Sequence, residues 1–404
     1  MNLLHPSARV VDAATGERLT PALIDAAAAE IAGETIVFLP MPTTVAAVAR
    51  YLAALRLEKP VLLLDPDLDH SALIARYTTG DVHPDLALLL TTSGSTGDPK
   101  LVRLSWSAVL ANAGQVADSL GVTGDDVAIT TLPLFYSYGL SVLHSHLLRG
   151  ATVVLERAGI MQKDFWAAID EHRVTSLAFV PSQYEMLRRL RFDPARYPSV
   201  RTLTQAGGRL RTDLVTDFAS RMDAVGGRMF VMYGQTEAGP RMACLPPDRL
   251  TDRLGSVGRA MPGGAFAIED DEVVYRGPNV MMGYAETAAD LTRGDDLAGV
   301  LYTGDLGRLD EEGFLYLTGR LKRMAKVFGV RINLDDVERH FPVAAVAGDD
   351  RLHVFTQDGD VRALRSKIAE WLGAHFTGVD VRTIPSLPLL PNGKTDYRAL
   401  EALL

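Results

Sequence analysis

The sequence predicts an α/β protein, with a large N-terminal domain built on mostly parallel sheets and a small α+β C-terminal domain. Between residues 36 and 232, short apolar runs alternate with amphipathic stretches, which is typical of parallel strands joined by helices. From residue 253 to about 320, glycine and proline interrupt short alternating segments, which indicates a small antiparallel β subdomain. The length of 404 residues suits about two to three domains.

Eight buried strands are expected in the first region, because each is a short apolar run bounded by turn signals. They cover 36–39, 61–64, 86–90, 127–131, 152–155, 177–180, 202–204 and 229–232. Between the first two strands, apolar residues from Val45 to Leu55 recur at the spacing of a helix face. Another helix is expected to open at Ser182, because the run from Ser182 to Glu185 fits a capping box.

The chain after residue 322 predicts a compact α+β domain, with a helix near 361–372 and a proline- and glycine-rich end at 385–393. We therefore expect an N-terminal domain over 1–321, whose β subdomain spans about 253–320, and a C-terminal domain over 322–404. The sequence contains no internal repeat and no low-complexity tract.

Composition argues against several classes of protein. A formal charge of -9 offers no basic excess for gripping nucleic acid through its phosphates. The apolar runs are far shorter than the roughly 20 residues that span a bilayer, and the first residues do not resemble a secretory signal. The single cysteine, Cys244, excludes an internal disulfide and a multi-cysteine metal site. We expect a cytoplasmic protein without nucleic-acid or membrane partners.

A loop rich in glycine and hydroxyl groups follows the predicted strand 86–90 and closes with Lys100. Its residues include Thr92, Ser93, Gly94, Ser95, Thr96 and Gly97. Glycines let the backbone approach a polyphosphate, while hydroxyls and an ammonium supply hydrogen-bond donors. A Walker A loop needs Gly-Lys-Ser/Thr running into a helix, whereas here Pro99 precedes the lysine. A surface turn is the alternative interpretation.

This loop and six later motifs resemble, in sequence order, those of the adenylate-forming superfamily of acyl-CoA synthetases, peptide-synthetase adenylation domains and luciferases. The later motifs are 205–208 (QAGG), 233–237 (YGQTE), 302–305 (YTGD), 319–322 (GRLK), 326–329 (KVFG) and 391–394 (PNGK). The resemblance implies that a carboxylate attacks the α-phosphate of ATP, that pyrophosphate leaves, and that the acyl group then passes to a thiol.

The resemblance also implies which residues bind the nucleotide. Beyond the loop and Lys100, the corresponding positions are Gly207, Gly208, Tyr233, Gly234 and Gln235. The two glycines would let the backbone lie beside the adenine, and Tyr233 would stack on it. Read alone, the glycine pair is also compatible with a simple turn.

Four polar residues would handle phosphate, metal and ribose. Thr236 would bond phosphate or acyl oxygens, and Glu237 would hold Mg²⁺, which suits one carboxylate combined with phosphates. Asp305 would accept both ribose hydroxyls, because an ionised carboxylate only accepts hydrogen bonds, and Arg320 would donate from the opposite side. A turn with an Asx bond is the alternative for 302–305.

Two lysines of the C-terminal region would alternate in the active site. Lys394 would contact the attacking carboxylate and the α-phosphate, where a mobile charge follows the developing negative charge. Lys322 occupies the hinge position, and rotation there would exchange Lys394 for the segment that begins at Lys326. Gly329 would then line a narrow pantetheine tunnel. Lys326 is equally compatible with a surface charge.

The segment 131–140 resembles the one that opens the acyl pocket. Tyr136, Ser137 and Ser182 would line this pocket, although each also suits core packing. No Asp or Glu occurs between Asp126 and Glu156, so a substrate ammonium would lack a counter-charge there. We therefore expect an aryl, aliphatic or related carboxylic acid without a free α-amine.

Coenzyme A is the expected thiol acceptor. An acyl carrier protein with its phosphopantetheine is the alternative, since Arg188, Arg189 and Arg191 offer a basic face, although such a face is more often merely solvated. A non-catalytic nucleotide-binding scaffold is a third interpretation, and it leaves Lys394 without a use. Compared with the family, the segments before the phosphate loop and after residue 322 are short.

Overall fold

The computed structural model describes residues 3–91, 100–327, 330–348, 351–373, 375–390 and 393–404, and for residues 322, 324, 326, 330 and 331 it describes the backbone alone. The chain divides into two compact units. The first comprises Met1–Ala265 and Tyr275–Leu301, and the second comprises Phe266–Val274 and Tyr302–Leu404. The division lies before the expected boundary at 321/322, which stays a prediction.

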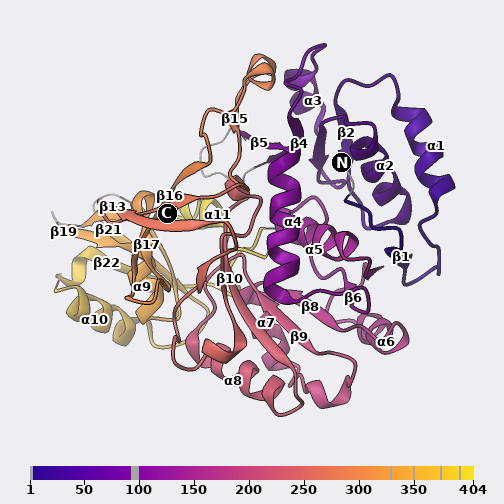
Figure 1. Cartoon of the computed structure of the whole chain (residues 1–404). Coiled ribbons are helices and arrows are strands. Elements are labelled where there is room, and N and C mark those ends of the chain that lie inside the picture. The colour runs from indigo at the N-terminus through magenta and orange to yellow at the C-terminus, as the bar shows by residue number, and fades with distance from the viewer. Residues whose placement is uncertain (1–2, 92–99, 328–329, 349–350, 374, 391–392) are drawn as a thin grey trace. The chain divides into compact units, whose positions relative to one another are not determined.

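An eight-stranded sheet of the first unit has the order β1-β7-β6-β8-β9-β10-β11-β12 (Figure 1). Its strands are β1 (Arg9–Asp12), β6 (Val127–Ile129), β7 (Thr152–Leu155), β8 (Ser176–Phe179), β9 (Thr202–Gln205), β10 (Arg228–Tyr233), β11 (Ala243–Leu245) and β12 (Arg259–Ala260). The six from β1 to β10 pair in parallel, and the last two pair antiparallel. Parallel strands are buried on both faces, which explains why apolar runs alone predicted most of them.

A five-stranded sheet of the same unit has the order β15-β5-β4-β3-β2. Its strands are β2 (Val37–Pro40), β3 (Val61–Leu64), β4 (Leu86–Thr91), β5 (Leu101–Ser105) and β15 (Gly283–Ala285). β2, β3 and β4 are parallel, whereas β5 and β15 join antiparallel. The sequence did not predict β5, in which Arg103 interrupts the apolar pattern.

Two helices lie between these sheets. α4 (Trp106–Leu120) packs against β4 and β5, α5 (Ser137–Leu148) packs against β6 and β7, and the two helices pack on each other. The other helices of the unit are α1 (Pro21–Ile31), α2 (Val45–Arg56), α3 (Ser71–Tyr77), α6 (Lys163–Glu171), α7 (Pro181–Arg189) and α8 (Thr212–Asp223). The helix predicted between the first two strands is α2.

The predicted start of α7 at Ser182 is wrong. The helix begins at Pro181, and Val180 is its N-cap. The side chain of Gln183 accepts a hydrogen bond from the Val180 N–H at 3.1 Å. Proline at the first helical position needs no hydrogen-bond partner for its nitrogen, so Ser182 is not required as a cap.

The second unit begins with a four-stranded sheet in the order β13-β14-β16-β17. Its strands are β13 (Ala265–Glu269), β14 (Glu272–Arg276), β16 (Val300–Leu309) and β17 (Leu315–Arg320). β12 and β15, which fall in the segment expected to form a β subdomain, instead pair with strands of the first unit. The four-stranded sheet therefore contains fewer strands of the segment 253–320 than the predicted β subdomain would.

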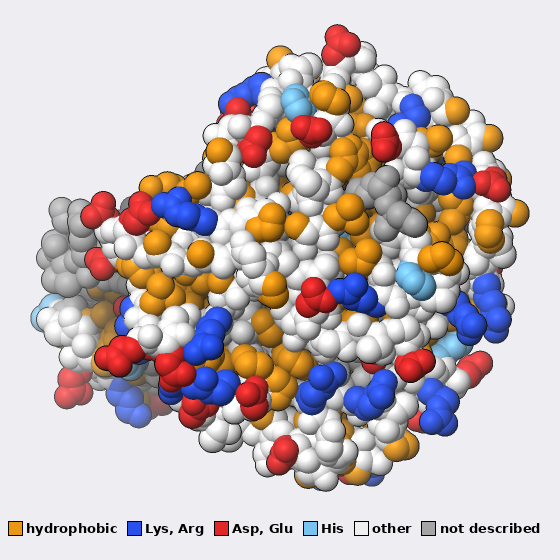
Figure 2. All heavy atoms as spheres, viewed as in Figure 1, with side chains coloured by type: hydrophobic (Ala, Val, Ile, Leu, Met, Phe, Trp, Pro, Cys, Tyr) orange, Lys and Arg blue, Asp and Glu red, His pale blue; other side chains and the backbone are white. Residues whose placement is uncertain are grey.

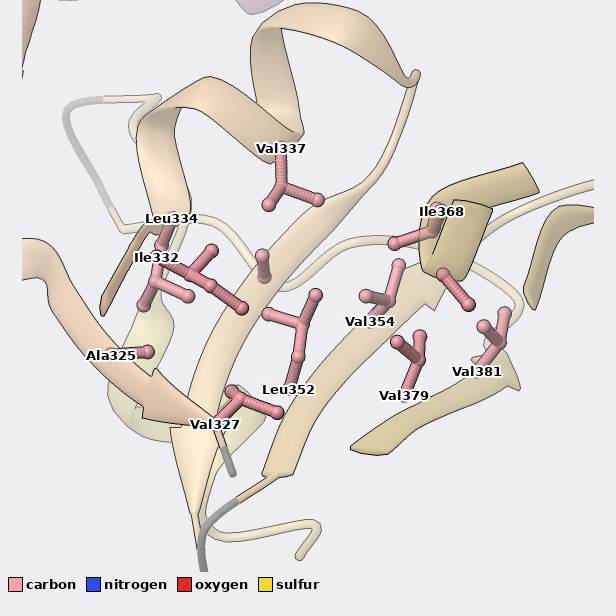
Figure 3. Packing of buried hydrophobic residues seen from close by; sticks show 12 residues of the cluster. Ala325, Val327, Ile332, Leu334, Val337, Leu352, Val354, Ile368, Val379 and Val381 are labelled. Atoms are coloured by element: carbon pink, nitrogen blue, oxygen red, sulfur yellow. The ribbon is translucent and has the colours of Figure 1, made fainter. Parts of the chain in front are cut away.

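The rest of the second unit packs around two clusters of buried apolar residues. Its elements are β18 (Met324–Val327), β19 (Val330–Asn333), α9 (Leu334–His340), β20 (Ala344–Gly348), β21 (Arg351–Thr356), α10 (Val361–Leu372), β22 (Val379–Thr383) and α11 (Tyr397–Glu401). In one cluster, shown in Figure 3, the side chains of Val327, Ile332, Leu352, Val354 and Ile368 converge from the strands β18, β19 and β21 and the helix α10. The bounds of α10 are those predicted from the sequence.

Charged side chains of both signs lie among one another on the face shown in Figure 2. Within the part of the chain that the structure describes, no helix has the length and apolar character needed to cross a bilayer.

Candidate active site

The predicted phosphate loop connects the two strands of a hairpin. β4 and β5 pair antiparallel, with Thr91 opposite Leu101. The residues Thr92, Ser93, Gly94, Ser95, Thr96 and Gly97 lie outside the described residues. Lys100 is described and exposed, immediately before β5. The buried strands on both sides thus fix where the loop leaves the sheet and where it returns.

Lys100 is linked to Glu237 through a neighbouring tyrosine. β15 pairs antiparallel with β5, so Tyr284 on β15 and Glu286, the residue after that strand, lie alongside the lysine. Lys100 forms an ion pair with Glu286, and its Nζ lies 5.9 Å from the centre of the Tyr284 ring. The Tyr284 hydroxyl donates to Glu237 Oε1 at 2.8 Å. Burial and the adjacent Glu237 raise the pKa of Tyr284, so the hydroxyl keeps its proton.

A tight loop after β10 presents the residues predicted to bind phosphate and metal. Tyr233 ends the strand and is buried, while Thr236 and Glu237 begin a short 3-10 helix. A Cβ on Gly234 would lie 1.7 Å from the carbonyl oxygen of Pro240, so this close approach of two backbone segments requires glycine. Gln235 lies between Gly234 and Thr236 and is the N-cap of the 3-10 helix.

Four of the predicted site residues lie together at the start of α5. Ser137 Oγ is 3.2 Å from Thr236 Oγ1. Gly207 has a φ of +82°, and a Cβ there would lie 3.0 Å from the Tyr136 hydroxyl oxygen. Burial raises the pKa of Tyr136 to about 12, so this hydroxyl is neutral near pH 7. The structure therefore joins the predicted acyl pocket to the predicted nucleotide site.

Gly208 connects this group to the start of α7. A Cβ on Gly208 would lie 3.3 Å from Pro181, the first residue of the helix. Ser182 is the next residue and is half-buried. On the basic face of the same helix, Arg188 forms an ion pair with Glu185, which lies three residues earlier on α7.

The loop after β10 also carries Arg241, a residue that no sequence motif marks. Its side chain is buried, and its guanidinium lies 3.6 Å from the centre of the Tyr138 ring. The backbone is held by Asn112 and Asn279, whose side-chain amides both donate to the Arg241 carbonyl at 2.9 Å. Only the position of Arg241, four residues after Glu237, could have drawn attention to it.

In the second unit, Asp305 and Arg320 form a direct ion pair. They are register partners on β16 and β17, and Arg320 Nε donates to Asp305 Oδ1 at 3.0 Å. The carboxylate is buried, whereas the Arg320 side chain is 58% exposed. Thr303 Oγ1 also accepts from the Asp305 N–H at 3.1 Å, which fixes the turn before the carboxylate.

The residue after the predicted hinge is firmly anchored. Lys322 lies in a short 3-10 helix, Leu321–Arg323. Arg323 forms ion pairs with Asp335 at 2.6 Å and Glu338 at 2.8 Å, both on α9. It also lies 3.9 Å from the centre of the Tyr397 ring on α11. The backbone of Lys326 is part of β18, its side chain is not described, and Gly329 lies outside the described residues.

Lys394 is part of a closed turn. The Leu390 N–H donates to the Lys394 carbonyl at 2.8 Å, and the Gly393 N–H donates to the Leu390 carbonyl at 2.8 Å. Leu389 and Thr395 form an antiparallel bridge on either side. The turn thus holds the half-buried lysine at a defined place next to α11.

Known proteins resemble the chain in sequence. The family model described as AMP-binding enzyme matches residues 76–285. A 2-succinylbenzoate–CoA ligase of Bacillus velezensis is 33% identical over 290 residues, which are 67% of this chain and 58% of that protein. An indoleacetate–CoA ligase of Aromatoleum aromaticum is 34% identical over 274 residues, which are 64% of this chain and 52% of that protein. The chain thus spans somewhat more than half the length of the curated relatives it matches.

Solved structures share the fold. o-Succinylbenzoate CoA synthetase of Bacillus subtilis, in complex with its acyl-adenylate, superposes with a TM-score of 0.78 at 23% identity, covering 97% of this chain and 94% of that one. ATP-bound MatB of Rhodopseudomonas palustris superposes with a TM-score of 0.80 at 22% identity, covering 98% and 96%. These likenesses confirm the predicted fold class, with a large multi-sheet N-terminal part and a small α+β C-terminal part.

Proposed function

Because the chain belongs to the family of AMP-binding enzymes, we propose that it activates a carboxylic acid with ATP and transfers the acyl group to coenzyme A. The named relatives are ligases that join aromatic-ring acids to CoA. One observation carries the proposal within this chain. Lys100, Tyr284 and Glu237 form one chain of contacts from the phosphate loop to the metal-binding position.

The residues of the first unit position the nucleotide and the acid. Lys100 neutralises phosphate charge, and Tyr284 holds Glu237 by donating its hydroxyl proton. Thr236 donates to the oxygens between acid and phosphate, supported by Ser137. Gly207 and Gly208 border the adenine, and Tyr233 stacks on it, as their motifs imply. Displacement at phosphorus needs positioning and charge neutralisation more than covalent help from the protein.

Magnesium suits the donor set at Glu237. A single half-buried carboxylate, with one oxygen held by Tyr284, resembles the protein share of a Mg²⁺ site in which phosphates and waters supply the other ligands. When bound, the ion neutralises charge on the ATP phosphates. Lys100 would attract the phosphates directly, and Glu237 would hold the ion.

The residues of the second unit complete the proposal. Asp305 accepts the ribose hydroxyls beside Arg320, and Lys394 contacts the reacting carboxylate and the α-phosphate during adenylation. Rotation at Lys322, the proposed start of a domain over 322–404, then withdraws Lys394. The segment with Lys326 and Gly329 takes its place for thiol attack.

Pyrophosphate exchange with a panel of aryl and aliphatic acids tests this proposal. We expect exchange with at least one acid, and formation of its CoA thioester when CoA is added. Lys394→Ala should lower exchange about 100-fold or more, because it removes the charge that meets the developing oxyanion. The same variant should still form thioester from supplied acyl-adenylate.

Lys367→Ala is the matched control, because Lys367 is an exposed lysine on α10 of the same unit. It should behave like the wild type in both half-reactions. No exchange with any acid would favour a nucleotide-binding scaffold. Thioester formation with a carrier protein but never with CoA would correct the acceptor, and equal loss of both half-reactions in Lys394→Ala would refute domain rotation.

A further inference from the structure

Arg241 is a buried cation to which the structure gives no anionic partner. Its side chain is 3% exposed, and its Nε has no hydrogen-bond partner. Within the described ranges, no carboxylate lies at ion-pair distance from its guanidinium; its one ring contact is the stack on Tyr138. Burying an unpaired guanidinium costs far more than such a stack returns. The residue is therefore poorly explained as a stabilising element of the fold.

The neighbouring titratable groups do not supply the missing negative charge. Tyr136, Tyr138 and Cys244 are the groups whose charges would act on Arg241. Burial raises the pKa of Tyr136 and of Cys244 to about 12 and also raises the pKa of Tyr138. All three are neutral near pH 7. The guanidinium therefore faces neutral groups.

Hydrogen bonds fix both the backbone of Arg241 and the tyrosine ring on which its guanidinium stacks. Two buried asparagines, Asn112 and Asn279, fix its backbone carbonyl. The Tyr138 ring beneath the guanidinium is fixed as well, since its hydroxyl donates to the Thr204 carbonyl at 3.2 Å. Fixing both the chain and the stacking partner lowers the cost of ordering when a ligand binds.

The position of Arg241 relates it to the acyl pocket. It follows Thr236 in the same loop, and Thr236 contacts Ser137 at the start of α5. Tyr138, on which Arg241 stacks, lies one residue beyond Ser137 and edge-on to Tyr136, with ring centres 6.4 Å apart. The guanidinium thus lies on the residue that directly follows Tyr136 and Ser137, the two residues proposed to line the acyl pocket.

We propose that Arg241 binds a second carboxylate of the substrate, so that the acids this protein activates are dicarboxylic acids. The inference rests on the proposed function, because it assigns the reacting carboxylate to Thr236 and Lys394. The other carboxylate lies at the far end of the acyl chain and pairs with the guanidinium. A planar guanidinium suits a carboxylate because it donates two parallel hydrogen bonds.

Matched pairs of acids test the inference. Succinate, adipate and homophthalate are each compared with their monoamides in pyrophosphate exchange. For the wild type we expect kcat/KM for the best diacid to exceed that for its monoamide by about 30-fold or more, since a desolvated charge pair is being made. In Arg241→Gln the ratio should fall to about one, and exchange with the monoamide should persist, because the neutral amide does not need the guanidinium.

Two further variants separate binding from folding. Arg241→Lys keeps the charge without the planar fork and should retain part of the discrimination. Arg308→Gln removes another arginine that stacks on a tyrosine, 4.3 Å from the Tyr316 ring centre, and should leave the ratio unchanged. A wild-type ratio of one or less, or an unchanged ratio in Arg241→Gln, would overturn the inference while exchange itself upholds the proposed function.

If no acid supports exchange, calorimetric titration of the diacids without ATP still tests the anion site at Arg241 separately from the proposed ligase function. If no acid supports exchange, but one of the three diacids binds the wild type and not Arg241→Gln, the anion site stands and the ligase function fails. If none of the three diacids binds or exchanges, the inference about Arg241 is refuted, and the proposed function fails with it only when no acid of the wider panel supports exchange either.

Discussion

Arg103 and Arg241 are both buried in the first unit, but their surroundings differ. Arg103 on β5 is 0% exposed and donates to Asp296 at 2.5 Å and to the carbonyls of Met282 and Gly294 at 3.2 Å. Among the residues that the structure describes, the guanidinium of Arg241 contacts the face of the Tyr138 ring and forms no ion pair. A charge paired on several sides fastens segments of the fold together, whereas a buried charge without an ionic partner destabilises the fold and marks a candidate ligand site.

The largest effect should follow from removing the paired arginine. Arg103→Gln should lower the free energy of unfolding by about 3 kcal/mol, because the carbonyls of Met282, Arg293 and Gly294 and the carboxylate of Asp296 lose their donor together. Urea unfolding of the wild type and the variant measures the difference. A loss below about 1 kcal/mol would mean that the arginine is not an important clamp, and the contrast with Arg241 would weaken.

A third buried side chain that can carry a positive charge, His144 on α5, avoids the cost of a buried charge because it stays neutral. Its Nε2 hydrogen-bonds the Tyr51 hydroxyl at 2.8 Å, and burial lowers its pKa to about 3. The unfolded chain takes up a proton below about pH 6.5 and the folded one does not, so acid favours unfolding. Lowering the pH from 7 to 5 should cost about 2 kcal/mol through this residue alone.

Unfolding at several pH values in His144→Asn measures that contribution. The amide can still bond Tyr51 but does not titrate, so the loss of stability between pH 7 and 5 should shrink by about 2 kcal/mol. His146 keeps its own share of the slope, because burial also lowers its pKa. An unchanged slope would show that His144 is protonated in the folded protein.

The smallest effect should come from the unpaired arginine. Arg241→Met should leave the free energy of unfolding of the unliganded protein unchanged or raise it by about 1 kcal/mol, because a desolvated charge is replaced by an apolar side chain of similar length. Chemical unfolding without substrate tests this. A loss of several kcal/mol would place Arg241 in the same class as Arg103 and refute the contrast.

The local parts of the fold followed from the sequence, because parallel strands buried on both faces are continuous apolar runs. The strands at 61–64 and 152–155 and the helix at 361–372 have the predicted bounds. The antiparallel strands β5 and β15 were missed. Each is short, and pairing between residues 101–103 and 283–285 depends on contacts far apart in the chain.

The site shows the same division between local and long-range information. Ser137 and Thr236 were both predicted as site residues, and the structure brings them together. Tyr284 was missed because its contact with Glu237 arises from the β5–β15 pairing. Arg241 was missed because burial without a partner is a property of the surrounding fold, and an isolated arginine in a sequence reads as a surface residue.

The two arginines flanking the proposed hinge determine where twisting can occur. Arg320 is fastened to Asp305 on one side, and Arg323 is fastened to α9 on the other. Leu321 and Lys322 are the two residues between these fastenings. Any swivel of the C-terminal elements about this point must therefore be concentrated in the torsion angles of two residues. A rotation at the proposed hinge would therefore act as a two-residue pivot and not as a flexible linker.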